Sequence, residues 1–105
     1  MVVTRPFSRA IFKENTAIDL AELFRALGDP SRIKILSILL DGEENVNSLA
    51  QKVDISESAV SHHLRGLRQM QIVHSRRMGK NVFYSLADDH VVILLRQGLD
   101  HVRHG

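Results

Sequence analysis

Cysteine and tryptophan are absent from this chain of 105 residues. Without cysteine, the chain cannot form a disulfide, a thiolate nucleophile or a thiolate metal site. Long apolar runs are also missing, because no stretch approaches the ~20 consecutive apolar residues of a membrane span. The stretch "MVVTRPFSRAIFKENTA" at the N-terminus is too polar and too broken for a signal peptide. We therefore expect a cytoplasmic protein without a membrane partner.

Positive charge is concentrated in one part of the chain. The whole sequence carries 14 basic and 12 acidic residues, for a net charge of +2. Residues 57–81 hold five basic residues and one acidic residue. Such a concentration favours a polyanionic partner, although a solvated surface explains the charge by itself equally well. The length suits one small domain whose modest core makes oligomerisation expected.

Apolar periodicity predicts one domain over residues 16–105, preceded by an arm or a short helix over residues 1–15. Five helices are expected, over residues 16–27, 30–40, 46–53 and 57–71, and from near residue 88 to close to the C-terminus. Two strands are expected over residues 72–77 and 81–86, on either side of a glycine-containing turn. Predicted N-caps are Asp29, Asn47 and Ser56, and the first two helices are expected to end at Gly28 and at Asp41-Gly42.

This order of elements predicts a winged helix–turn–helix, which is a mainly helical fold with a β-hairpin (α+β). The fourth helix is expected to enter the major groove of DNA, because four of its polar side chains fall at i, i+3, i+4 and i+7 and share one face. The hairpin tip is expected to lie on phosphates or in the minor groove. The predicted DNA-binding residues are Ser56, Ser58, Ser61, His62, Arg65, Arg76, Arg77, Lys80 and Asn81.

Histidines gather in the last 18 residues, "DDHVVILLRQGLDHVRHG", whereas the first 61 residues contain none. In a helix, His90 and His101 are eleven steps apart, or about 1100°, so they share a face with His104 and Gln97. They also lie about 16 Å apart along the axis, whereas a zinc–nitrogen bond is about 2.0–2.1 Å long. One helix therefore cannot hold a single ion between them.

Two copies of this helix packed antiparallel bring His90 of one chain to His101 and His104 of the other. An aspartate at the N-cap then completes one oxygen and three nitrogens, a tetrahedral set for zinc, with cobalt(II) as a possible substitute. Spacing alone leaves Asp88 and Asp89 both open as the oxygen donor. The positions of these residues can also be explained without a metal, because aspartates at the start of a helix and histidines at its end interact favourably with the helix dipole.

Three stretches resemble the ArsR/SmtB family of winged-helix metal-sensing repressors, over roughly residues 16–104. They are "LFRALGDPSRIKILSIL", "ISESAVSHHLRGLRQMQIV" and "GKNVFYSLADDHVVILLRQGLDHVRH". The final pattern, D-x-H followed by H-x-x-H, resembles the zinc-sensing subgroup with its site at the dimer interface.

The resemblance implies a homodimer, formed through the N- and C-terminal helices, that binds operator DNA without metal. Zinc binding would lower the DNA affinity and derepress metal efflux or sequestration genes. The implied ligands are Asp88 and His90 of one subunit with His101 and His104 of the other. The resemblance also implies that His101 donates a hydrogen bond toward the backbone near Gln71, and we place Gln97 beside the same ligands.

The chain departs from the family pattern at one point. Many members carry a cysteine-containing metal box in the stretch that here reads "EENVNSLA", and Asn45 stands where a cysteine is expected. That second site is therefore absent. The alternative function is a metal-independent winged-helix repressor regulated by another signal. We expect no enzymatic activity, because four protein ligands leave a zinc ion no open coordination position.

Overall fold

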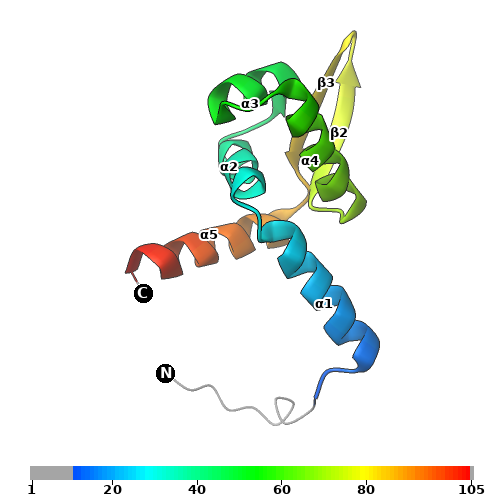
Figure 1. Cartoon of the computed structure of the whole chain (residues 1–105), viewed down its shortest axis with the longest axis vertical. Coiled ribbons are helices and arrows are strands. Elements are labelled where there is room, and N and C mark those ends of the chain that lie inside the picture. The colour runs from blue at the N-terminus through cyan, green and yellow to red at the C-terminus, as the bar shows by residue number, and fades with distance from the viewer. Residues whose placement is uncertain (1–10, 105) are drawn as a thin grey trace.

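A computed structural model describes residues 11–104 as five helices and a small sheet (Figure 1). The helices are α1 (Glu14–Leu27), α2 (Pro30–Leu39), α3 (Val46–Val53), α4 (Glu57–Gln69) and α5 (Asp89–His104), and the strands are β1 (Glu44–Asn45), β2 (Val73–Met78) and β3 (Asn81–Leu86). The predicted winged helix–turn–helix is confirmed. No helix among the described residues is long and apolar enough to cross a membrane.

The core lies between α2, α3 and α4. Its twelve buried apolar residues are Ala26, Ile35, Leu36, Leu39, Leu49, Ala50, Val53, Val60, Leu64, Leu67, Ile72 and Val73. Each of these three helices places an apolar stripe on the others, whereas α1 buries only Ala26 fully and α5 buries no residue fully. The two terminal helices therefore keep much of their apolar surface uncovered in a single chain.

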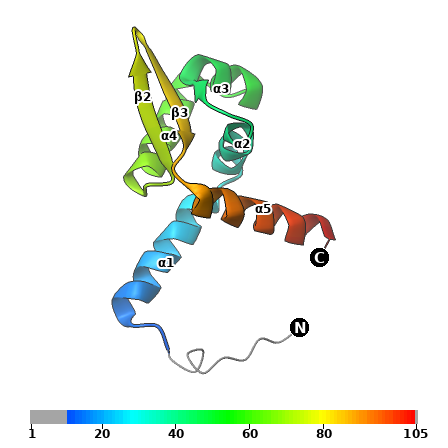
Figure 2. The same cartoon turned by 180° about the vertical axis from the view of Figure 1, so that it is seen from behind.

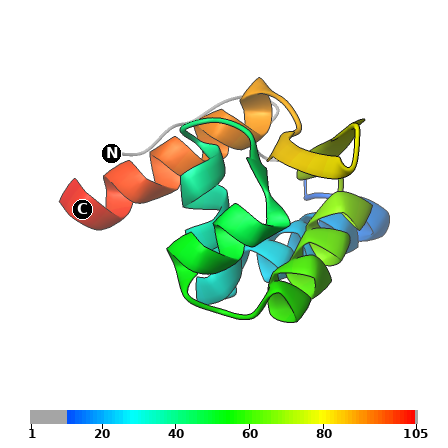
Figure 3. The same cartoon turned by 90° about the horizontal axis from the view of Figure 1, so that it is seen from above.

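The elements divide the molecule into two ends. In Figures 1 and 2, α1 and α5 extend from one end of the α2–α4 body, and the β2–β3 hairpin extends from the other. Seen from above, α5 and the hairpin point to opposite sides (Figure 3). The hairpin and the outer ends of α1 and α5 thus lie at opposite ends of the molecule (Figures 1 and 2).

The sheet has one strand more than expected. Its order is β1-β3-β2, with all pairs antiparallel, and the short β1 pairs Glu44 with Tyr84 and Asn45 with Phe83. A two-residue strand has no periodicity to read, so the sequence pattern missed it. In the hairpin, β2 begins one residue later than predicted and extends to Met78, and Gly79 adopts the positive φ of 61° that the tight turn requires.

Helix caps explain most element boundaries, and one of them corrects the sequence analysis. Asp29 and Ser56 accept hydrogen bonds from backbone N–H groups in the first turns of α2 and α4, as predicted. The cap of α3, however, is Asn45 and not Asn47, because the Asn45 side chain accepts the Ser48 N–H at 2.8 Å. Asn47 lies inside the helix, where its side chain bonds to Glu57 instead.

Two further boundaries differ from the prediction. Helix α1 begins at Glu14, so Glu14 and Asn15 belong to the helix and not to the expected arm; residues 1–10 of that arm lie outside the described residues. Helix α4 ends at Gln69, because Gln71 adopts a left-handed φ of 60° and its N–H bonds back to the Arg68 carbonyl. A left-handed residue commonly ends a helix in this way.

Candidate DNA-binding surface and metal ligands

The polar face of α4 is held by the turn that precedes it. Asp54 ends α3 in the left-handed conformation, with φ of 64°, and the chain turns directly into the Ser56 cap. The Asn47 amide donates to the Glu57 carboxylate at 3.0 Å, which ties the two helices together across the turn. This arrangement positions α4 as the second helix of a helix–turn–helix.

Most of the residues predicted to contact DNA are exposed. Ser58, His62 and Arg65 are exposed on α4, and Ser61 is half-buried. Ser56 is exposed too, but its hydroxyl oxygen accepts the Ala59 N–H at 3.0 Å, so it serves as a cap. The α4 face is therefore open to a ligand.

The hairpin presents a second basic group beside this face. Arg77, Lys80 and Asn81 are exposed on β2, at the turn and at the start of β3. Their side chains have no hydrogen-bonded partner among the described residues. They are therefore free to meet phosphates or base edges.

Arg76 is engaged within the molecule, which the sequence pattern did not indicate. Its guanidinium donates two hydrogen bonds of 2.6 Å to the Glu43 carboxylate and lies 5.8 Å from the centre of the Phe83 ring. The hydrogen bonds from Arg76 lower the pKa of Glu43 below its ordinary value of 4.5. The same pair raises the pKa of Arg76. Arg76 thus secures the hairpin to the segment before β1.

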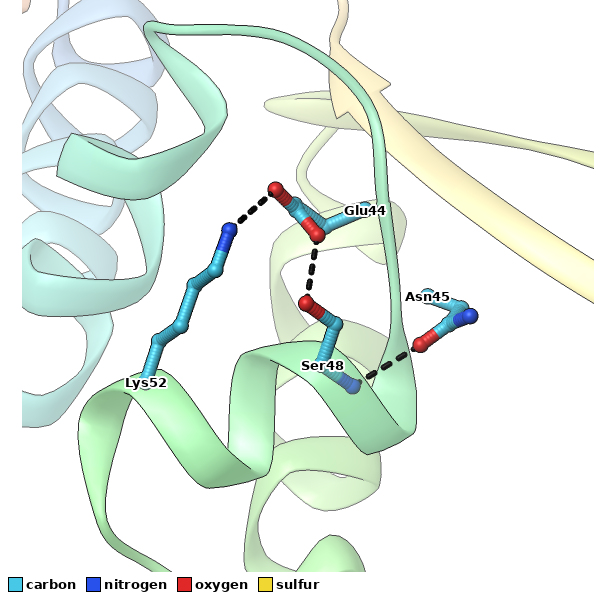
Figure 4. A network of polar contacts seen from close by, with 4 residues as sticks. All are labelled: Glu44, Asn45, Ser48 and Lys52. Atoms are coloured by element: carbon cyan, nitrogen blue, oxygen red, sulfur yellow. Dashed lines mark hydrogen bonds and ion pairs between the residues drawn. The ribbon is translucent and has the colours of Figure 1, made fainter.

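A second carboxylate anchors the start of α3 (Figure 4). Glu44 accepts hydrogen bonds from the Lys52 ammonium at 2.7 Å and from the Ser48 hydroxyl at 2.6 Å. These bonds lower the pKa of Glu44. Because Glu44 lies in β1, ahead of the helix, its contacts with Ser48 and Lys52 do not follow from helical spacing.

One half of the predicted ligand set lies at the start of α5. Asp88 precedes the helix and accepts the Val91 N–H at 3.1 Å, so it has the N-cap position that the ligand hypothesis required. The same carboxylate oxygen lies 3.7 Å from Nδ1 of His90. Asp88 and His90 are therefore neighbours, and the His90 side chain is 96% exposed.

The other half lies at the end of the same helix. His101 and His104 are exposed in the last turn, and Nε2 of His104 lies 3.7 Å from the Asp100 carboxylate. Within residues 11–104, no group of three or more potential ligands comes together. The single chain thus holds two separate pairs. Gln97 and Gln71 are both exposed, and neither side chain has a partner that defines its role.

An apolar groove of about 450 Å³ runs along α5. It is formed by α1, α2 and α5, and its lining residues are Phe24, Leu27, Ile33, Ser37, Leu40, Leu94, Leu95, Gly98, Leu99 and Val102. Several of these side chains remain strongly exposed, and Val102 is the most exposed of them at 81%. Uncovered apolar surface of this kind marks an interaction site.

Comparison with known proteins agrees with this geometry. The family model described as "Bacterial regulatory protein, arsR family" matches residues 29–75. The chain is 51% identical to the "Transcriptional repressor SmtB homolog" of Synechocystis sp., over 83% of this chain and 66% of that protein. It is 41% identical to the "Cadmium resistance transcriptional regulatory protein CadC homolog" of Staphylococcus aureus, over 82% of this chain and 72% of that protein.

A solved structure shows the same architecture. The solution structure of a homodimeric winged helix-turn-helix DNA-binding domain from Mycobacterium bovis, a possible ArsR-family regulator, is similar with a TM-score of 0.79 and 25% identity. The likeness covers 90% of each chain. These relatives are transcriptional regulators, so the prediction that the chain is not an enzyme is confirmed. The chain belongs to the ArsR family of bacterial regulatory proteins.

Proposed function

We propose that the chain is a metal-responsive transcriptional repressor that binds operator DNA as a metal-free homodimer and releases it when zinc binds. The observation that carries this proposal is the division of the ligands on α5. Asp88 and His90 lie at one end and His101 and His104 at the other, beside an uncovered apolar groove. A second copy of the chain would cover the groove with its own apolar surface and would complete each metal site with its own ligands.

The DNA-binding part of the proposal rests on α4 and the hairpin. The exposed polar face of α4 carries Ser58, His62 and Arg65, and the hairpin adds Arg77 and Lys80. Small polar side chains allow a close approach to bases, and basic side chains neutralise phosphates. Because operator DNA lies in the bacterial cytoplasm, we place the protein there.

The dimer part rests on the groove and on the fold. Much of the apolar surface of α1 and α5 is uncovered, as expected for helices that pack against a partner. A solved relative with the same fold is homodimeric. Twofold symmetry then pairs each end of α5 with the opposite end of the partner helix and produces two equivalent sites.

The donor set fits zinc. One carboxylate oxygen and three imidazole nitrogens match zinc's preference for a tetrahedral shell, and cobalt(II) suits the same shell. All four side chains are exposed. The relative named for cadmium resistance supports a role in metal response. Asp88 is the proposed oxygen donor, because it already adjoins His90 at the N-cap.

Repression would end through a shift between two dimer geometries. When bound, the metal joins donors of both subunits. Asp88 and His90 would then be held against the partner's His101 and His104, which fixes the two α5 helices in one relative position. A geometry whose two α4 helices no longer match successive major grooves binds DNA more weakly. We propose that His101 passes this change on through its second ring nitrogen to the backbone near Gln71, and that Gln97 supports the ligand face.

The test compares DNA binding with and without zinc. A duplex is first selected by the wild-type chain from a random library, and its dissociation constant is then measured by fluorescence anisotropy. Zinc should weaken binding by roughly 5- to 150-fold, the usual range of allosteric coupling. His90→Ala should bind the duplex normally without zinc and should respond little to it.

His74→Ala serves as the control, because His74 is an exposed histidine of β2 outside the ligand set. Its zinc response should equal that of the wild type. Calorimetric titration should give two zinc ions per wild-type dimer. A wild-type chain that binds the duplex but no zinc would instead be a repressor controlled by another signal.

A further inference from the structure

Arg32 connects α2, on which it lies, to both α1 and α4. In the proposed function, α1 belongs to the dimer contact and α4 to the DNA contact. Its Nε–H donates to Nδ1 of His63 on α4 at 3.2 Å, and its Nη1 donates to the carbonyl oxygen of Ala26 in the last turn of α1 at 3.4 Å. Arg32 itself belongs to the first turn of α2. A single guanidinium thus bonds to both α1 and α4, and its planar fork suits two such directed bonds.

Gly66 provides the space that this guanidinium occupies. A Cβ placed on Gly66 would lie 2.7 Å from Nη2 of Arg32 and 3.2 Å from its Cζ. Glycine in the middle of a helix is otherwise unfavourable, because it loses more conformational freedom on folding than alanine. Because the guanidinium is the flexible end of its side chain, Arg32 could make room for a methyl group here only by giving up its bonds to His63 and Ala26, and this is a physical reason for glycine at this position of α4.

Two side chains at the start of α2 lie against the ring of His63. Its Nδ1 accepts from Arg32, and its Nε2 lies 4.0 Å from the carboxylate of Asp29, the cap of α2. The His63 side chain is only 19% exposed, whereas its neighbour His62 is exposed on the face proposed to meet DNA. Contacts to His63 therefore act on the part of α4 that carries the proposed DNA contacts.

The opposite end of the connection lies in the last turn of α1. Ala26, which accepts the second bond from Arg32, stands between Phe24 and Leu27, and both of these line the groove. A path of direct contacts thus runs from the last turn of α1, which also carries Phe24 and Leu27, through Arg32 to the middle of α4. Its side chains differ from the proposed route through His101 and Gln71.

We propose that Arg32, His63 and Gly66 form a joint that orients α4 relative to the dimer helices. In a dimer, this orientation determines the distance and angle between the two α4 helices, and hence the spacing of the DNA half-sites that they fit. Arg32 and His63 are positioning residues here and not DNA contacts. The inference rests on the proposed DNA-binding dimer and does not depend on the metal.

The first experiment tests the joint without DNA, by a double-mutant cycle in thermal unfolding of the full-length chain. Gly66→Ala and Arg32→Ala should each lower the melting temperature. The double variant should melt well above the temperature that the sum of the two decreases predicts, because removal of Arg32 vacates the space for the new methyl group. Additive decreases would overturn the joint. Lys34→Ala, an exposed change of the same charge on α2, serves as the control and should combine additively with Gly66→Ala.

The second experiment tests the role of the joint in DNA recognition. Binding is measured to the selected duplex and to the same duplex with one base pair inserted between its half-sites. The wild type should prefer the selected duplex, and Arg32→Ala and His63→Leu should lose at least about tenfold of that preference. His63→Asn should retain it, because its amide oxygen can accept the Arg32 bond. A variant that is only less stable would lose affinity for both duplexes alike.

The two experiments separate the possible failures. If the wild-type chain selects no duplex, the proposed function fails, and the melting cycle still decides whether the joint exists. If the wild type binds and the variants keep its spacing preference, the joint does not orient α4, and the inference is wrong.

Discussion

Asp88 combines two roles that a single substitution can separate. It caps α5 through the Val91 N–H and is also the proposed oxygen donor to the metal. Asparagine caps helices about as well as aspartate but carries no negative charge. We expect Asp88→Asn to leave the melting temperature nearly unchanged and to weaken zinc binding at least about tenfold, as measured by competition with a chromophoric chelator.

The neighbouring carboxylate provides the matched comparison. Asp89→Asn changes the same charge one residue later, in the first turn of α5. Its zinc affinity should remain close to that of the wild type. The opposite result, with Asp89→Asn the weaker binder, would assign the oxygen donor to Asp89.

The pair formed by Glu43 and Arg76 should make the stability of the fold depend on pH. Because Arg76 lowers its pKa in the folded chain, the pair stabilises the fold above pH 4.5, the ordinary value for glutamate, and this contribution disappears as the pH falls through the lowered pKa. Glu43→Gln should therefore lower the melting temperature slightly at pH 7, and this difference should shrink as the pH falls toward 3. Circular dichroism melts between pH 7 and pH 3 measure this.

A control for Glu43 is available on α1. Glu22 is an exposed glutamate far from the hairpin in sequence, and Glu22→Gln makes the same chemical change. The melting difference between Glu22→Gln and the wild type should stay small throughout. A Glu43→Gln difference that does not shrink as the pH falls from 7 to 3 would show that the Arg76 pair is not its cause.

At the scale of elements, the start of α3 gives a direct test of the corrected cap. Asn45 accepts the Ser48 N–H, whereas Asn47 reaches only exposed polar partners. Asn45→Ala should cost about 1 kcal/mol of unfolding free energy, the usual effect of losing an N-cap, and Asn47→Ala should cost clearly less. Chemical denaturation at a fixed protein concentration provides both values. Equal effects would return Asn47 to consideration as the cap.

The elements themselves were largely predictable because their signals are local. Caps such as Asp29 and Ser56, the turn at Gly79 and the apolar spacing along each helix depend on residues only a few positions apart. Some errors were local, such as the choice of Asn47 over Asn45 as the cap of α3, and another occurred where a distant segment decided the outcome. Strand β1 exists because Glu44 and Asn45 pair with β3, about forty residues later in the chain.

At the scale of the whole molecule, the apolar groove predicts the oligomeric state. Leu99 lines the groove and is 44% exposed, so Leu99→Glu places a charge in the proposed dimer contact. We expect a monomer by light scattering and at least about a 100-fold loss of DNA affinity, because the two half-sites are then bound independently.

Met78→Glu is the matched control for the groove. Met78 is also an exposed apolar residue, at 51%, but it lies at the end of β2, away from the groove. This variant should remain dimeric, even if its DNA affinity changes. A Leu99→Glu chain that stays dimeric would mean that the partner contacts another surface.

The candidate histidine ligands could be named from the pattern of α5, since helical geometry alone makes the histidine stripe and separates its two ends by more than one ion can bridge, whereas spacing left Asp88 and Asp89 both open. Helix positions, the hairpin and the polar face of α4 follow in the same way from neighbouring residues. The pairing of Arg76 with Glu43 and of Arg32 with His63 could not be predicted from the sequence, because 33 and 31 residues separate the partners in the chain. Only the packing of α2 on α4 and of β1 on the hairpin brings these side chains together, and many other basic and acidic residues matched them equally well in the sequence.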